Sequence, residues 1–242
     1  MDALAVREVF AEGLGLRKWI INDARAAALA ESYFGAGRAL ESFNIVYFGY
    51  GIGGGSIIER RLYAGSFGNA AALGSYFPHA ARRPSGQDRL NYAADRGLRV
   101  DSLFDLPEDL SQHIDVGPWI DWTCDQLHPV LELVKVMFDG EAIVIGGLLP
   151  SAVEQRIAEG LEARTPAHVR ETRYLASSLA RQEFHLAAAS IPQFEITHPH
   201  AYKGQVAKGA RDPHRADRHT KAQAWTRRQA FASDKEIAPL PA

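Results

Sequence analysis

The chain has 242 residues, of which 46% are hydrophobic and 23% charged, as in an ordinary globular protein that can bury a substantial core. Twenty-seven basic against 29 acidic residues give a net charge of −2, which argues against a protein built around nucleic-acid or membrane electrostatics. The single cysteine, Cys124, excludes an internal disulfide and a thiolate metal cluster. No apolar stretch approaches the roughly 18 residues of a membrane span, and the N-terminus lacks a basic-then-apolar signal. We therefore expect a cytoplasmic protein without a membrane partner.

The chain opens with signals for a helix, a short strand and a second helix. Apolar residues at helical spacing predict a helix over residues 3–14, and residues 19–21 have strand composition. Asn22 and Asp23 then precede an alanine-rich helix over residues 24–33. Asp23 should lie near the N-terminus of that helix, where a carboxylate meets free N–H groups.

A glycine run separates the next two strand signals. Phe43–Phe48 is dense in β-branched and aromatic residues, glycines recur over residues 49–55, and strand character resumes over residues 56–62. This pattern predicts an antiparallel hairpin around a glycine turn. Taken alone, the run fits a plain tight turn as well as a nest of N–H groups for phosphate oxygens. A strand rather than a helix follows it, and no Lys-Ser or Lys-Thr closes it, so neither a dinucleotide fingerprint nor a Walker loop fits.

The rest of the chain predicts a long amphipathic helix, a buried strand and another helix, followed by a change of composition. These elements are expected over residues 117–138, 142–145 and 151–161. Strands that alternate with helices favour an α/β sheet with covering helices. Residues 198–231 hold four histidines and eight Lys or Arg against two acids, with few aliphatic side chains. We expect the tail over residues 198–242 to be basic and disordered, because it can bury little apolar surface.

Four segments, taken in order, resemble the ROK family of repressors, open reading frames and sugar kinases. They are Asn22-Asp23 with the alanine-rich stretch to Glu31, the glycine run, residues 62–70, and residues 142–147 followed by Leu149-Pro150. The resemblance covers roughly residues 1–160. It implies an α/β lobe of the ribonuclease-H-like or actin-like ATPase type with covering helices. Residues 1–197 would then form a ROK-like sugar-kinase domain, mainly its second lobe.

The resemblance also assigns roles to particular residues. It implies that Asn22 and Asp23 bind the sugar and that Asp23 is the general base for the sugar hydroxyl. A carboxylate within hydrogen-bond reach of the attacking hydroxyl suits phosphoryl transfer. The nucleotide-binding residues that it implies are Gly51, Gly53, Gly54, Gly146 and Gly147. ATP with Mg²⁺ would be the cofactor of an active enzyme, and the alternative role for Asp23 is a helix N-cap.

Two departures from the family concern the sugar and zinc sites. Where the kinases carry Ala-Gly-Glu-x-Gly-His, this chain has Ala72 in place of the Glu and Ser75 in place of the His. Neither replacement supplies the charged partner that grips sugar hydroxyls in the family. The family's zinc cysteines are absent from residues 77–98, and His79 alone makes no metal site. We expect no structural zinc.

A third departure concerns the phosphate loop. No Asp-x-Gly-x-Thr loop precedes Asn22, so we expect most of the first lobe to be missing. ATP binding should then be no tighter than roughly the high-micromolar range. No winged helix-turn-helix is recognisable, so no DNA-binding domain is expected in this chain. The resemblance also implies a homodimer.

Three functional hypotheses follow. The first is an ATP-dependent kinase for a hexose or an N-acetylhexosamine that acts through Asp23. The second is a catalytically impaired, sugar-sensing or regulatory ROK remnant, which the changes at Ala72 and Ser75 favour. The third is a structural fragment without function. The sugar itself is not specified by these residues.

Overall fold

A computed structural model describes residues 21–78, 81–166 and 171–197. The helix expected over residues 3–14, most of the strand expected over 19–21, His79 and the basic tail lie outside these ranges. Ile21, the one described residue of that strand, is not in a strand. The α-helices and strands are, in chain order, α2 (Asp23–Phe34), β1 (Phe43–Phe48), β2 (Ile52–Ile58), β3 (Arg61–Leu62), α3 (Gly86–Ala94), α4 (Leu110–His113), α5 (Gly117–Phe138), β4 (Ala142–Gly147), α6 (Ser151–Arg164), β5 (Arg173–Ala176) and α7 (His185–Thr197).

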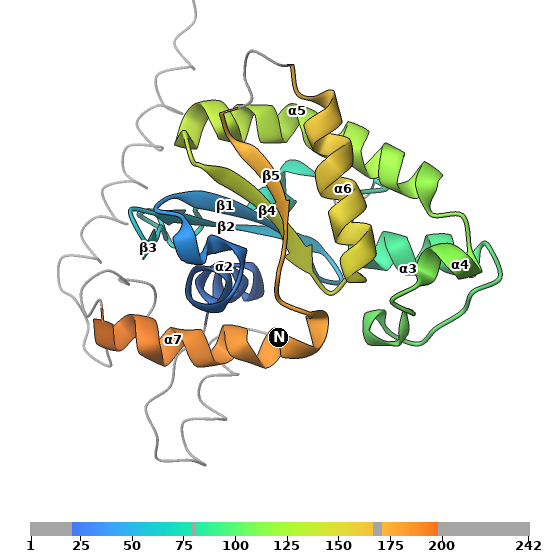
Figure 1. Cartoon of the computed structure of the whole chain (residues 1–242), viewed down its shortest axis with the longest axis horizontal. Helices are drawn as coiled ribbons and strands as arrows, with labels where there is room; N and C mark the ends of the chain where they lie inside the picture. Colours follow the sequence, from blue (N-terminus) through green and yellow to red (C-terminus); the bar gives the residue numbers. More distant parts are fainter. Residues whose placement is uncertain (1–20, 79–80, 167–170, 198–242) are drawn as a thin grey trace, which may run out of the picture. The chain divides into compact units, whose positions relative to one another are not determined.

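The strands form one five-stranded sheet in the order β3-β2-β1-β4-β5. β1 pairs antiparallel with β2 and parallel with β4, and β4 pairs parallel with β5. All six residues of β1 are buried, as are the first five of β4, because helices cover both faces of the sheet. Figure 1 shows α2 and α7 on one face and α5 and α6 on the other. The α/β class predicted from the sequence is confirmed.

The predicted hairpin is present, but its second strand begins earlier than the sequence indicated. β1 pairs with Ile52–Ile58, so Gly53, Gly54 and Gly55 lie within β2 rather than in the turn. The expected continuous strand over residues 56–62 is broken instead by a second turn at Glu59 and Arg60. The glycine turn between the two strands is therefore confined to residues 49–51.

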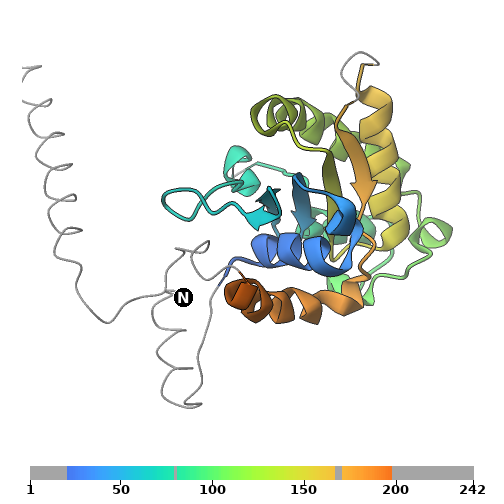
Figure 2. The same cartoon turned by 60° about the vertical axis from the view of Figure 1, so that its left-hand side comes forward.

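Two of these glycines allow α2 to pack closely on the sheet (Figure 2). A Cβ atom at Gly53 would lie 2.8 Å from the Cβ of Ala24, and one at Gly55 would lie 2.9 Å from the Cβ of Ala28. Residues two apart in a strand and four apart in a helix each share a face, so the two pairs repeat one contact along the interface. The alanines of α2 and the glycines of β2 thus serve a close helix–sheet approach.

The predicted long helix and its burial are also confirmed. α5 spans Gly117–Phe138 and buries Trp119, Cys124 and Leu127 against the core. The rings of Trp119 and Phe48 lie 6.3 Å apart, which joins α5 to β1. The first half of α5 is therefore core, as expected. Its last turns expose Val136 and Met137.

Candidate functional site

Asn22 and Asp23 begin α2, and both side chains are exposed. Asn22 occupies the N-cap position, but its side chain makes no capping hydrogen bond. Instead, the N–H of Ala24 donates to Asp23 Oδ1 at 2.9 Å. Asp23 is therefore the first helical residue, and one of its carboxylate oxygens is held by the backbone of the first turn.

The other carboxylate oxygen of Asp23 faces the end of β1. A Cβ atom built on Gly49 would lie 3.5 Å from Asp23 Oδ2. Among the described residues, no donor forms a hydrogen bond with Oδ2. The carboxylate thus stands beside the 49–51 turn with one oxygen available to a ligand.

A cavity of about 360 Å³ opens between the start of α2, the start of β2 and the segment over residues 68–75. Its volume lies in the range of about 300–1,000 Å³ that small-molecule sites occupy. The described residues that line it are Asn22, Arg25, Gly51, Ile52, Gly53, Gly54, Gly68, Asn69, Ala70, Ala72, Gly74, Ser75 and Arg83. The structure therefore brings together Asn22, three of the predicted glycines, and the two replaced positions, Ala72 and Ser75. Asp23 does not line this cavity.

The three glycines of this cavity differ in whether their surroundings leave room for a side chain. A Cβ atom at Gly53 would meet Ala24, and one at Gly54 would lie 2.5 Å from the carbonyl oxygen of Ala71. A Cβ atom at Gly51 would have no atom within 4 Å. Packing therefore explains why glycine is needed at positions 53 and 54. At Gly51 no neighbouring atom excludes a side chain, and the lack of one leaves the cavity wider.

The polar character of the cavity comes partly from residues that the sequence did not single out. Arg25 is buried, and its Nη2 donates to the carbonyl oxygen of Ala70 at 3.3 Å. Arg83 and Asn69 line the cavity from other segments. Arg25 follows Asn22 by three residues, a spacing that places both on one face of a helix and was visible in the sequence. Nothing in the sequence indicated Arg83.

Gly146 and Gly147 lie apart from this cavity, at the carboxyl end of β4. A Cβ atom at Gly146 would lie 2.8 Å from Ser177 Cβ. Gly147 has a φ of 137°, and a Cβ there would lie 2.4 Å from the carbonyl oxygen of Phe48. Local packing and backbone conformation thus account for both glycines, and their nucleotide role stays a prediction.

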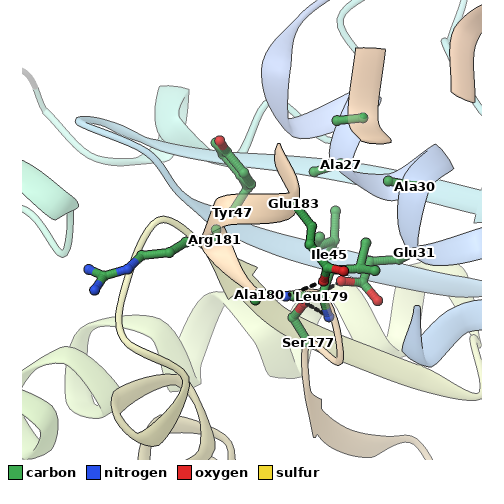
Figure 3. Close-up of a pocket in the computed structure, with 12 residues that line it drawn as sticks. Ala27, Ala30, Glu31, Ile45, Tyr47, Ser177, Leu179, Ala180, Arg181 and Glu183 are labelled. Atoms are coloured by element: carbon green, nitrogen blue, oxygen red, sulfur yellow. Dashed lines mark hydrogen bonds between the residues drawn. The ribbon is translucent and has the colours of Figure 1, made fainter. Parts of the chain in front are cut away.

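Gly147 lines a second, smaller cavity of about 30 Å³ between α2, β1 and the segment before α7. Figure 3 shows Glu31 and Ser177 side by side there, with the guanidinium of Arg181 directed away from them. Ser177 Oγ donates to Glu31 Oε1, and the N–H of Ala36 donates to Glu31 Oε2 at 2.7 Å. Burial raises the pKa of Glu31, and these two hydrogen bonds lower it in part. The cavity is too small for a sugar or a nucleotide.

A second buried carboxylate, Glu154 on α6, was also not predicted. It is 2% exposed, and its Oε1 has no hydrogen-bond partner among the described residues. Burial raises the pKa of Glu154 well above its usual range, and the nearby charges of Glu31 and Glu108 raise it further, while Arg181 lowers it. The Glu154 carboxyl therefore favours its protonated form more strongly than an exposed glutamate does.

Within residues 21–78, 81–166 and 171–197, no three His, Cys, Asp or Glu side chains gather as metal ligands. No helix in this part of the chain is long and apolar enough to span a membrane. Cys124 is buried, and burial raises the pKa of its thiol to about 11.

Comparisons with known proteins connect the chain to one family. Residues 2–87 match the model of the ROK family. The protein y4fQ of Sinorhizobium fredii is 34% identical over 156 residues, which cover 63% of this chain and 39% of that protein. A glucokinase of Streptomyces coelicolor is 43% identical over 61 residues, which cover 25% of this chain and 19% of the glucokinase. The chain thus spans about two fifths of the first of these relatives and a smaller share of the second.

Solved structures share the fold. A ROK family glucokinase from Streptomyces griseus, in complex with glucose and AMPPNP, superposes with a TM-score of 0.60 at 20% identity, over 76% of this chain and 71% of the glucokinase. A ROK hexokinase from Thermus thermophilus superposes with a TM-score of 0.58 at 23% identity, over 79% and 70% of the two chains. These similarities confirm the actin-like ATPase fold that the resemblance implied. Residues 2–87 thus match the ROK family, and the described residues share the fold of two ROK sugar kinases of known structure.

Proposed function

We propose that the chain binds a sugar in the cavity beside Asn22 and transfers a phosphoryl group from ATP to a sugar hydroxyl, with Asp23 as general base. The observation that carries the proposal is the meeting of Asn22, Gly51 and Ser75 in one cavity next to the Asp23 carboxylate. The glucokinase of known structure supports the choice of ligands, since it was solved with glucose and AMPPNP.

Phosphoryl transfer requires an acceptor for the proton of the sugar hydroxyl. It also requires open space through which the phosphate oxygens of ATP can approach the backbone. The hydroxyl proton would pass to Oδ2 of Asp23, the hydroxyl oxygen would bond to the γ-phosphorus, and the bond to the leaving ADP would break. Oδ1 is held by the N–H of Ala24, which fixes the carboxylate during this step. Because Gly51 has open space where a side chain would project, the backbone there is the part of the turn best placed to approach phosphate oxygens.

A kinase assay with ATP and a panel of hexoses and N-acetylhexosamines tests this proposal. Asp23→Asn keeps an oxygen for the Ala24 N–H but cannot take the proton, so turnover should fall about 10²–10⁴-fold. Asp139→Asn is the matched control: Asp139 is exposed at the end of α5, with a φ of 47° that asparagine adopts readily, and its turnover should match the parent's. Undiminished turnover in a folded Asp23→Asn would refute the general-base role. An unfolded variant would make Asp23 structural instead.

A second candidate is a sugar sensor without turnover, and the lining of the cavity supports it. Ala72 and Ser75 stand at the wall where the family resemblance places Glu and His. Each lost charged partner costs about 1.5–3 kcal/mol of binding, so two losses weaken affinity for a neutral sugar by roughly two to four orders of magnitude. Sugar binding by calorimetry, together with no turnover on any sugar of the panel, would favour this candidate over the kinase.

A further inference from the structure

The charged side chains that line the cavity beside Asn22 are all cationic. Arg25 and Arg83 are the only charged residues among its described lining, and no Asp or Glu is among them. The neutral polar side chains there are Asn22, Asn69 and Ser75. A site that recognises neutral sugar hydroxyls needs strong acceptors, and a carboxylate supplies them. This cavity offers strong donors instead.

Arg25 is built into the wall of the cavity rather than extended into solvent. Its side chain belongs to the first turn of α2 and is 7% exposed. Nη2 donates to the carbonyl oxygen of Ala70, so the cavity segment itself fixes the guanidinium. A buried, fixed cation binds an anion more strongly than an exposed one, because water screens it less and little side-chain freedom is lost on binding.

Arg83 is the second arginine of the lining and comes from a different part of the chain. It precedes α3, whose N-cap Ser85 accepts a hydrogen bond from the N–H of Asp88. The neighbouring Arg82 does not line the cavity: it forms an ion pair with Asp88 at 2.9 Å and stacks on Trp122. Adjacent arginines thus have different environments, one at the cavity and one on the surface of α3 and α5.

We infer that the ligand of this cavity is a sugar that carries an anionic group, a phosphate or a carboxylate, which Arg25 and Arg83 bind. The inference rests on the proposed sugar site and names its ligand class. Guanidinium groups match the planar oxygen pairs of carboxylates and phosphates, and charge-assisted hydrogen bonds are about twice as strong as neutral ones. The lack of a carboxylate in the described lining and the presence of two arginines act in the same direction, since both disfavour a neutral sugar and favour an anionic one.

The test is calorimetric titration of the full chain with glucose, glucose 6-phosphate, glucuronate and inorganic phosphate. The two anionic sugars should bind about tenfold to a hundredfold more tightly than glucose, and more tightly than inorganic phosphate. Arg83→Gln should remove most of this preference, and Arg82→Gln, the matched control, should keep it. Arg25→Lys retains the charge but not the paired donors, so it should weaken anionic sugars by about tenfold while the chain stays folded.

The results of this titration distinguish a failure of the anionic-ligand inference from a failure of the proposed sugar site. Glucose binding as tightly as glucose 6-phosphate would overturn the inference and leave the sugar site standing. Phosphate binding as tightly as the sugar phosphate would show a simple anion site and also overturn it. If no sugar binds to the folded chain, the proposed function fails as well. A preference that survives Arg83→Gln and Arg25→Lys unchanged would remove both arginines from the site.

Discussion

The glycines in β2 and in the turn just before it have different surroundings, although they are close together in the sequence. A side chain at Gly54 would collide with the Ala71 carbonyl oxygen, whereas one at Gly51 would meet nothing. Gly54→Ala should therefore destabilise the fold by about 1–3 kcal/mol, as overpacking does. Gly51→Ala should change the free energy of unfolding by no more than about 0.5 kcal/mol, as at an open surface position. Urea denaturation of both variants measures the difference.

The same pair of variants separates packing from ligand binding. Gly51→Ala puts a methyl group into the cavity, so it should weaken the sugar ligand about tenfold while the fold is retained. A Gly51→Ala variant with parental ligand affinity would show that the turn does not approach the ligand. A Gly54→Ala variant as stable as the parent would show that the loop over residues 71–73 moves away readily.

Buried Glu154 predicts a dependence of stability on pH. In the folded state its pKa lies well above the ordinary value of 4.5, so the folded chain holds a proton that the unfolded chain releases. Its contribution to stability is therefore full below about pH 4.5 and is lost as the pH rises toward the folded pKa. Glu154→Gln keeps the shape and removes the charge. It should be more stable than the parent at neutral pH, with the difference shrinking as the pH falls toward 4.5.

Urea unfolding of the parent and of Glu154→Gln, from about pH 4.5 to neutral pH, measures the difference between their free energies of unfolding. Glu31, Glu108 and Arg181 are the charges that act on Glu154, so Glu108→Gln, at an exposed position, should shift the profile only slightly. A parent and a Glu154→Gln variant with parallel pH profiles would mean that Glu154 is ionised in the folded state.

At the scale of elements, the turn between β2 and β3 is a strained connection of the sheet. Glu59 and Arg60 have φ values of 50° and 60°, a region that residues other than glycine and asparagine adopt at a cost. The Glu59 N–H donates to Ser42 Oγ at 3.0 Å, a bond that does not involve the side chain. Glu59→Asn should therefore stabilise the chain by about 0.5–1 kcal/mol. A thermal midpoint unchanged or lowered by this substitution would contradict the argument.

The elements that the sequence predicted best are those with a clear apolar pattern. β1 and α5 were predicted with their observed bounds, because a continuous apolar run and a long amphipathic repeat each leave few alternatives. The start of β2 could not be predicted, since glycines have low strand propensity and read as turn. Gly53 and Gly55 are in a strand because α2 packs against them, and that tertiary contact leaves no mark in local sequence.

At the scale of the molecule, the candidate site was only partly accessible from the sequence. Asn22 and Ser75 meet in one cavity, which the ordered family segments suggested. Arg83 could not be found, because its place at the cavity depends on how the segment before α3 folds. Gly146 and Gly147 were grouped with the nucleotide by resemblance, whereas the structure gives both a packing or backbone reason.

The tail over residues 198–242 supplies a prediction for the whole chain from its composition. Residues 198–231 of this tail hold four histidines and eight Lys or Arg with few aliphatic side chains, so they add little to a hydrophobic core. Removing residues 198–242 should leave the urea midpoint unchanged, and amides in the tail should exchange rapidly in the full chain. Slow exchange there, or a lowered midpoint after truncation, would show that the tail packs on the domain.

The central claim is that the cavity beside Asn22 is the sugar site, and amide chemical-shift mapping of the full chain tests it most directly. Added glucose 6-phosphate should shift the amide signals of Gly51, Asn69 and Ser75, which line the cavity, in a saturable manner. The signal of Gly147, at the second cavity, should stay in place. Saturable shifts confined to Gly147 and its neighbours, or no shift anywhere at millimolar sugar phosphate, would contradict the account.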